Sequence, residues 1–324
     1  LALSIYVREW IMHCMKKIAI LFFVVLSGLL KAQQDPQFSL NMFNIYSVNP
    51  AFSGSYDQFN ALAIQRSQWV GFDGAPVTQH LSVESPVYFL HGGVGLSLLN
   101  DKIGQEYTKQ ISLSYAYQTK ISRHSELGLG LNFGFVNLGV DGDWIAPDGT
   151  NGSNDNLIPK TASNDVIPDL GFGLYYRKKA LYVGYSITHL NQAKAVYDDA
   201  AVDFKLRRHH YLILGWEYDV RSDLVLHPSL YVKTDQVSTQ MDFNLNAKYG
   251  DHLWGGMTYR LDDALVLIAG YNINENLKFG YAYDITTSDL KSESSGSHEI
   301  LLRYSFKMRP PGKLPTHYRN IRYN

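Results

Sequence analysis

Oxygen-bearing side chains gather in the stretch DGDWIAPDGTNGSNDN, residues 141–156. Carboxylate and amide oxygens at this density are the ligands that Ca²⁺ takes in proteins. The stretch departs from the EF-hand pattern, because Ile145 and Ala146 occupy positions that require a ligand and a glycine. A calcium site and a plain surface loop are both open for residues 141–156. We expect the surface loop and assign no metal ligand.

A second candidate is the run of basic side chains Arg207, Arg208, His209 and His210. The two histidines fall on an expected strand, where neighbouring side chains point to opposite faces. They therefore cannot share one metal ion. We expect the run at a strand edge beside a longer loop, where it is either solvated or in contact with lipid phosphates.

The remaining motifs do not support a reaction. GLGLNFG, residues 128–134, has wrong spacing for a phosphate-binding loop, and its glycines alternate with large apolar residues, as on the lumen face of a strand. Ser186 lies in mid-strand and lacks the second glycine of a nucleophile elbow. An outer-membrane lipase or protease would need a carboxylate pair near a histidine, and we find none. The charges expected to face the lumen are dispersed: Arg66, Glu84, Asp242, Lys248 and Arg303. We predict no catalytic residue, no cofactor and no enzyme.

The elements that must position these residues are strands. The chain has 324 residues and a net charge of −1, which gives no reason to expect nucleic acid or an acidic substrate. Its 26 glycines and 23 tyrosines suit a β-rich protein with many tight turns. In QMDFNLNAKY, residues 240–249, polar and apolar side chains alternate, so that one face is apolar: Met241, Phe243, Leu245, Ala247 and Tyr249. We expect lipid on that face and a polar lumen on the other.

This alternation recurs from residue 59 onward, and no helical stripe interrupts it. We predict about fourteen strands, centred near residues 64, 82, 96, 114, 131, 173, 184, 214, 228, 245, 257, 268, 281 and 302. Short links are expected at residues 122–126, 177–180, 219–223, 249–252 and 272–276, and longer ones at 138–167, 188–208, 233–239 and 286–297. Outer-membrane barrels sort short and long links to opposite ends in this way. The sequence therefore predicts an all-β protein, a transmembrane antiparallel β-barrel over residues 59–306.

The segment before residue 33 is typical of an exported protein. Residues 15–32 have Lys16 and Lys17 in front, an apolar core from Ile18 to Leu30 and the small residue Ala32 at the end, which is the layout of a signal peptide. Residues 1–14 are interpreted as an upstream extension. Cys14 is the single cysteine and precedes the predicted cleavage point, so we expect no disulfide in the mature chain.

Most of the mature chain resembles the PorP/SprF family, and its N-terminal part carries the motifs. The resemblance rests on an opening Gln-x-Pro-x-Phe segment, an Asn-Pro-Ala-x-x-Gly turn, and a Gln-Trp to Gly-Ala-Pro stretch. The matching residues are Pro36, Phe38, Asn49, Pro50, Ala51, Gly54, Gln68, Trp69, Gly71, Phe72, Gly74, Ala75 and Pro76. From the residues alone, we expect 33–58 to cross the periplasmic mouth or to enter the lumen as a plug. We expect WVGFDGAP to form the first outer loop, with tight turns at Gly71 and Gly74.

The resemblance implies an outer-membrane component of the type IX secretion machinery found with gliding motility in Bacteroidota. It also implies periplasmic and outer-membrane partners from that machinery, together with secreted adhesins that carry a C-terminal sorting domain. A non-enzymatic adaptor for such cargo is our expectation, and a passive diffusion channel for small solutes is the alternative. The basic stretch 307–324 is expected in the periplasm, where it would dock a partner or contact lipid phosphates through Arg309, Lys313, Arg319 and Arg322.

Overall fold

The computed structural model describes residues 35–141, 162–197 and 204–308. The described residues from Pro36 onward belong to one compact unit. None of the described residues forms a helix long and apolar enough to cross a membrane.

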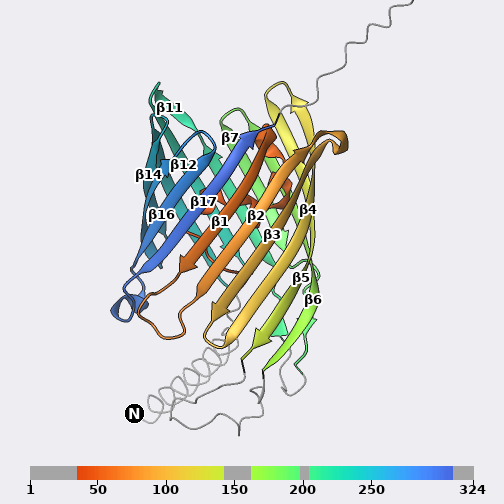
Figure 1. Cartoon of the computed structure of the whole chain (residues 1–324), viewed down its shortest axis with the longest axis vertical. Helices are drawn as coiled ribbons and strands as arrows, with labels where there is room; N and C mark the ends of the chain where they lie inside the picture. The colour runs from red at the N-terminus through yellow and green to blue at the C-terminus, as the bar shows by residue number, and fades with distance from the viewer. Residues whose placement is uncertain (1–34, 142–161, 198–203, 309–324) are drawn as a thin grey trace, which may run out of the picture. The chain divides into compact units, whose positions relative to one another are not determined.

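The described residues of this unit form seventeen strands. Figure 1 shows their arrangement. They are β1 (Gln58–Ser67), β2 (Val77–Val87), β3 (Gly92–Ile103), β4 (Glu106–Ser122), β5 (Ser125–Val140), β6 (Ser163–Lys178), β7 (Leu181–Thr188), β8 (Lys194–Ala195), β9 (Phe204–Lys205), β10 (His209–Trp216), β11 (Tyr218–Arg221), β12 (Leu224–Thr234), β13 (Thr239–Tyr249), β14 (Leu253–Arg260), β15 (Ala264–Asn272), β16 (Leu277–Thr286) and β17 (Ser297–Lys307). Short 3₁₀ helices accompany them: η1 (Asn41–Phe43), η2 (Ile45–Ser47), η3 (Pro50–Phe52), η4 (Ser55–Asp57), η5 (Tyr88–Leu90) and η7 (Asp289–Ser292).

The strands close into an antiparallel barrel. From β1 to β7 and from β12 to β17 each strand pairs with its neighbour along the chain, and β1 pairs with β17 from Gln58–Lys307 to Ser67–His298. Strand β10 pairs with both β7 and β12, and β11 continues it along β12, so β10 and β11 count as one barrel strand. With β8 and β9 in a separate two-stranded sheet, the barrel has fourteen strands. The predicted fold is confirmed, and every predicted strand centre falls inside a barrel strand.

The wall has the two faces that the alternation predicts. On β13, Phe243 and Leu245 are about half exposed on the outside, whereas Asp242 and Asn244 are buried on the inside. The pleat of the strand enforces this, because successive side chains leave the sheet on opposite sides. An apolar outer surface is stable only against lipid.

The links are sorted to the two ends of the barrel (Figure 1). One end, here called the short-turn end, carries compact links such as residues 123–124, 179–180 and 222–223. The other, the long-loop end, carries the links that include 141–162, 189–208 and 287–296, together with brief ones such as 104–105. In outer-membrane barrels the short turns face the periplasm. Strand β1 begins and β17 ends at the short-turn end.

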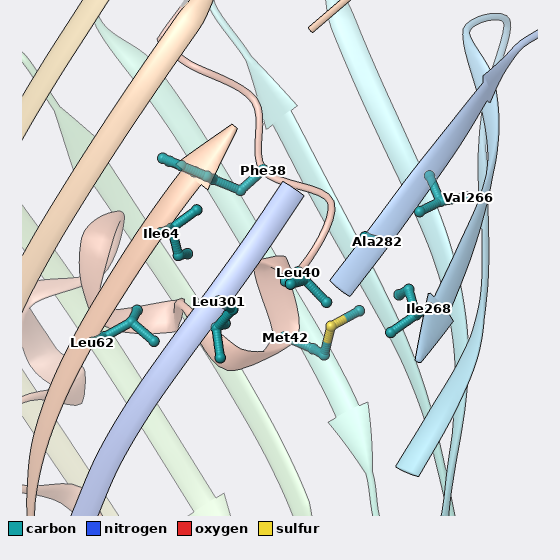
Figure 2. Close-up of a cluster of buried hydrophobic side chains, with 9 residues drawn as sticks. All are labelled: Phe38, Leu40, Met42, Leu62, Ile64, Val266, Ile268, Ala282 and Leu301. Carbon is teal, nitrogen blue, oxygen red and sulfur yellow. The ribbon is translucent and has the colours of Figure 1, made fainter. Parts of the chain in front are cut away.

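Residues 36–57, here called the inner segment, lie inside the barrel. Phe38, Leu40 and Met42 pack against inward-facing apolar side chains of β1, β15, β16 and β17, as Figure 2 shows. A second apolar cluster joins Tyr46 and Phe52 to tyrosines of β6, β7, β10 and β12. Two of the three buried apolar clusters among the described residues therefore lie between the inner segment and the wall.

Candidate functional site

The first part of the inner segment is held by carboxylates of the wall. The hydroxyl of Ser39 donates to Asp284 on β16 at 2.7 Å. The backbone N–H groups of Ser39 and Leu40 donate to the two oxygens of Glu299 on β17, at 2.7 and 2.9 Å. Hydrogen bonds to ionised acceptors are about twice as strong as neutral ones, so Asp284 and Glu299 fix this point of the chain.

Two arginines complete what we call the charged cluster. Arg66 on β1 pairs with Asp284 at 2.8 Å and with Glu299 at 3.1 Å. Arg260 on β14 pairs with Asp242 at 3.1 Å and with Asp284 at 3.0 Å. All five side chains are at most 2 % exposed. Because an unpaired charge is very costly at such burial, each member depends on the others.

The expectation that lumen charges are dispersed is wrong. Arg66 and Asp242 both belong to the charged cluster, and its other members, Arg260, Asp284 and Glu299, were missed. Closure of the barrel places β17 beside β1, and this brings residues more than 200 positions apart into contact. The sequence does show one feature that the members share. Each is a charged residue at an inward position near the long-loop end of its strand.

Two further predicted charges are also linked. Asn60 on β1 donates to Glu84 at 3.0 Å, and the guanidinium of Arg303 donates to the Asn60 side-chain oxygen at 2.7 Å. One amide thus bridges the carboxylate of β2 to the cation of β17. Of the five predicted lumen charges, only Lys248 belongs to neither group.

Further along the inner segment, Asn49 makes the turn that its sequence predicts. Its Oδ1 accepts from the N–H of Ala51 at 3.0 Å, and Pro50 occupies the first position of η3. Asparagine at the N-cap and proline at the first position are favoured because one supplies an acceptor and the other has no N–H to satisfy. The Asn49 Nδ2 donates to the carbonyl oxygen of Leu174 on β6 at 2.9 Å.

Where the backbone of this turn comes closest to the wall, the wall residues are glycines. A Cβ added at Gly130 would lie 2.1 Å from the Ala51 nitrogen, and one at Gly173 would lie 2.1 Å from the Asn49 Oδ1. Gly54 has φ +74° and lies against Gly93 on β3. The lumen-face placement of the 128–134 glycines is confirmed. At Gly128 and Gly130 its physical reason is the close approach of the inner segment, whereas Gly134 lies against Ile111 and Ser112 of β4.

Polar side chains of β4 bind the same turn. Gln118 donates to the carbonyl oxygens of Ala51 and Ser53, both at 2.9 Å. The hydroxyls of Ser53 and Ser114 are 3.1 Å apart, and Ser114 donates to the Tyr46 hydroxyl at 2.9 Å. Sequence reasoning missed Gln118 and Ser114, since single polar residues on an alternating strand carry no distinctive signal.

The inner segment meets the barrel at a strained junction. Tyr56 and Asp57 have φ of +67° and +50°, in the left-handed region that non-glycine residues rarely adopt. The Tyr56 hydroxyl lies 3.2 Å from the Tyr175 hydroxyl. The Arg177 guanidinium lies 4.2 Å from the centre of the Tyr56 ring. The N–H of Met308 donates to the Asp57 carbonyl oxygen at 2.8 Å, which joins the end of β17 to this junction.

Residues 68–76, here called the first outer loop, connect β1 to β2 at the long-loop end, as predicted. Gly71 and Gly74 have φ of +99° and +75°, so both supply turns that other residues resist. The loop is closed by Gln68, whose N–H donates to the Pro76 carbonyl oxygen at 2.9 Å. Ala75 donates from its N–H to the Phe72 carbonyl oxygen at 3.1 Å. The backbone N–H of Trp69 donates to the Ser297 hydroxyl at 3.0 Å.

Neighbouring loops hold the first outer loop on both sides. The N–H of Val70 donates to Gly296, and the N–H of Ser295 donates back to Val70, each at 2.8 Å. On the other side, the N–H of Gly104 donates to the Gly74 carbonyl oxygen at 2.8 Å. The loop is therefore ordered, yet the ring of Phe72 is 49 % exposed.

The other sequence candidates are placed as follows. His209 is buried inside the barrel, whereas His210 lies on the opposite face of β10 and contacts the Tyr185 hydroxyl at 2.8 Å. Arg207 pairs with Asp235 at 3.5 Å, and Arg208 donates to the Leu190 carbonyl oxygen. The predicted separation of the histidines is confirmed. Nearly all of the 141–156 stretch lies outside the described residues, as do the tail residues Arg309, Lys313, Arg319 and Arg322.

A family model described as "Type IX secretion system membrane protein PorP/SprF" matches residues 30–304. No curated protein matches the chain. Solved structures similar to it include the toluene transporter TbuX of Ralstonia pickettii, with 11 % identity over 81 % of this chain and 92 % of that one, and a TM-score of 0.45. The P. putida toluene transporter TodX is similar at 12 % identity over 81 % and 93 %, with a TM-score of 0.43. A Pseudomonas aeruginosa FadL homologue is similar at 12 % identity over 85 % and 95 %, with a TM-score of 0.41. At these scores the likenesses carry no argument about function.

Proposed function

Because the chain belongs to the PorP/SprF family of type IX secretion system membrane proteins, we propose that it is a non-enzymatic adaptor of that machinery. It is an outer-membrane β-barrel. In the proposed role it holds secretion components and cargo together at the outer membrane. The cargo would be surface adhesins or other proteins with a C-terminal sorting domain, including those used in gliding.

One observation supports the adaptor over a pore. The inner segment is bound to the wall at both of its ends, by the charged cluster around Ser39 and by the bonds of Asn49 and Gln118. A diffusion channel requires a water-filled path, whereas here a chain segment with its own apolar contacts fills part of the lumen. A barrel whose lumen is narrowed by its own chain is suited to act through its end surfaces.

The surfaces that fit the role lie at opposite ends. At the long-loop end, the first outer loop presents Phe72 on an ordered backbone, and exposed aromatic side chains on rigid supports are frequent anchors of protein interfaces. At the short-turn end, Met308 fixes the start of the basic tail beside Tyr88, whose hydroxyl donates to the Met308 carbonyl oxygen at 3.0 Å. We assign cargo or outer-membrane partners to the first outer loop and a periplasmic partner to the tail.

The test is co-purification from gently solubilised outer membranes of cells that express the secretion machinery. The tagged chain is compared with a tagged, unrelated barrel, and bound proteins are identified by mass spectrometry. Recovery of secretion components together with a sorting-domain protein supports the adaptor. Recovery of the barrel alone contradicts it.

A diffusion channel for small solutes is the second candidate. It is favoured by buried polar atoms inside the barrel that have no partner among the described residues, such as the side-chain oxygen and nitrogen of Asn246 and of Asn44. Such atoms indicate ordered water in part of the lumen. Single-channel conductance separates the two functions, because a channel gives stable open pores without any partner.

A further inference from the structure

Three cations line one sector of the barrel wall near the short-turn end. Lys278 on β16 lies directly opposite Arg303 on β17, and Lys248 on β13 lies opposite Trp254 on β14. All four occupy positions that the alternation turns inward. Like charges placed directly opposite each other destabilise a sheet. Their presence here therefore calls for a compensating charge.

The described residues supply little compensation. None of their carboxylates forms an ion pair with Lys248, Lys278 or Arg303. Arg303 and Lys248 both repel the ammonium group of Lys278. The carboxylate of Glu217 attracts it without forming an ion pair. Glu84 acts on Arg303 in the same way, while its own hydrogen bond goes to Asn60.

Unused hydrogen-bond donors adjoin the three cations. Asn246 precedes Lys248 on the same face, is 4 % exposed, and has no partner for its Nδ2 or its Oδ1. The buried Nε1 of Trp254 is likewise without a partner. The Trp254 ring lies over Gly270 and Gly280, and so reaches from β14 across to the strand of Lys278. Buried polar groups in native proteins are almost always hydrogen-bonded, which indicates that a ligand or water completes this sector.

We propose that this sector, formed by Lys248, Trp254, Lys278 and Arg303, binds a phosphate group that enters from the short-turn end. Ammonium, guanidinium, indole N–H and amide N–H groups are all donors, and a tetrahedral oxyanion accepts several of them at once. The phosphate belongs either to a free phosphate compound or to a lipid headgroup at the periplasmic rim. The site is independent of the adaptor role, so each can fail without the other.

The test uses the purified full chain in a zwitterionic detergent, with inorganic phosphate as the first probe and phosphatidic acid in mixed micelles as the second. Binding is measured by isothermal titration calorimetry, with Trp fluorescence as an independent signal. The variant is K248Q/K278Q. The control is K102Q, which removes a lysine whose ion pair with Asp141 is exposed at the long-loop end. Heat-modified gel mobility verifies that each variant is a folded barrel.

We expect saturable binding by the wild type and by K102Q, and at least tenfold weaker binding by K248Q/K278Q. In W254F, which removes the indole N–H donor, the fluorescence change should disappear and the affinity measured by calorimetry should fall. Saturation by inorganic phosphate identifies a soluble ligand, whereas saturation by phosphatidic acid alone identifies a headgroup. The proposal is overturned by a wild type that saturates with neither probe, or by equal affinities in the folded double variant and the wild type.

Discussion

The side-chain amide of Asn49 donates a 2.9 Å hydrogen bond to the backbone carbonyl oxygen of Leu174, a residue 125 positions further along the chain. This bond anchors the Asn-Pro-Ala turn of the inner segment to the sixth strand of the wall. The contact is possible because Gly173 has no side chain at the point of approach. The motif and the wall glycines are thus two halves of one interface.

Gly173→Ala is predicted to loosen this interface. The added Cβ would lie 2.1 Å from the Asn49 Oδ1, so the turn must move, at a cost of about 1–3 kcal/mol for overpacking. Amide exchange of residues 49–54, measured by mass spectrometry, should accelerate. The matched control is Gly171→Ala on the same strand, where the nearest atoms lie at 3.3 and 3.4 Å and belong to the wall itself. Equal exchange in both variants would show that the wall does not hold the turn.

Arg260→Met is predicted to destabilise the protein strongly. It leaves Asp242 and Asp284 without one of their cations at complete burial, and breaking such a pair costs roughly 3–5 kcal/mol. Urea unfolding in detergent or lipid measures the loss. Arg221→Met is the control, because the Arg221–Asp223 pair is largely exposed and contributes at most about 1 kcal/mol. A loss below about 1 kcal/mol in Arg260→Met would contradict the role given to the charged cluster.

Gly71→Val is predicted to disorder the first outer loop. Its φ of +99° is strained for a β-branched residue, at a cost of roughly 1–3 kcal/mol. We expect faster amide exchange over residues 68–76 with unchanged barrel unfolding. Ala75→Val adds the same type of side chain in the same loop without a positive φ, and should leave the exchange nearly unchanged. Similar exchange in the two variants would mean that the backbone of Gly71 does not order the loop.

Phe72→Ser is predicted to reduce recovery of outer-membrane partners or cargo at least tenfold, as expected for loss of an aromatic anchor worth about 2 kcal/mol. Barrel stability should change by less than about 0.5 kcal/mol, because the ring is exposed. Co-purification provides the measurement. Leu261→Ser alters another exposed apolar side chain at the long-loop end and should retain the partners. Full recovery of the partners with Phe72→Ser would show that the first outer loop does not bind them through Phe72.

The fold was predictable because barrel strands carry a local signal. Alternation with a period of two located every barrel strand, and the glycine and proline positions located the first outer loop. The turn at Asn49 was predictable for the same reason, since its cap and its proline are adjacent in sequence.

The charged cluster was not predicted, because its geometry depends on closure. Arg66 meets Glu299 across 233 positions, and each strand taken by itself shows only an inward charge near its long-loop end, not the partner on another strand. Gln118 and Ser114 were missed because each is a single polar residue on an alternating strand, and their partners lie in the inner segment, more than 60 positions away. Strand register, once assigned, would have placed Arg66 opposite Glu299.

The most direct test of the central claim is single-channel conductance in planar bilayers with the inner segment locked in place. The hydroxyls of Ser53 and Ser114 are 3.1 Å apart, so the S53C/S114C variant should form a disulfide, and Cys14 is the only cysteine in the sequence. The adaptor account predicts that the wild type and the oxidised variant are both silent, whereas a variant lacking residues 36–57 gives stable pores. Stable pores of the same conductance in the wild type and in the oxidised variant would show that solutes pass the inner segment, and the diffusion channel would then replace the adaptor.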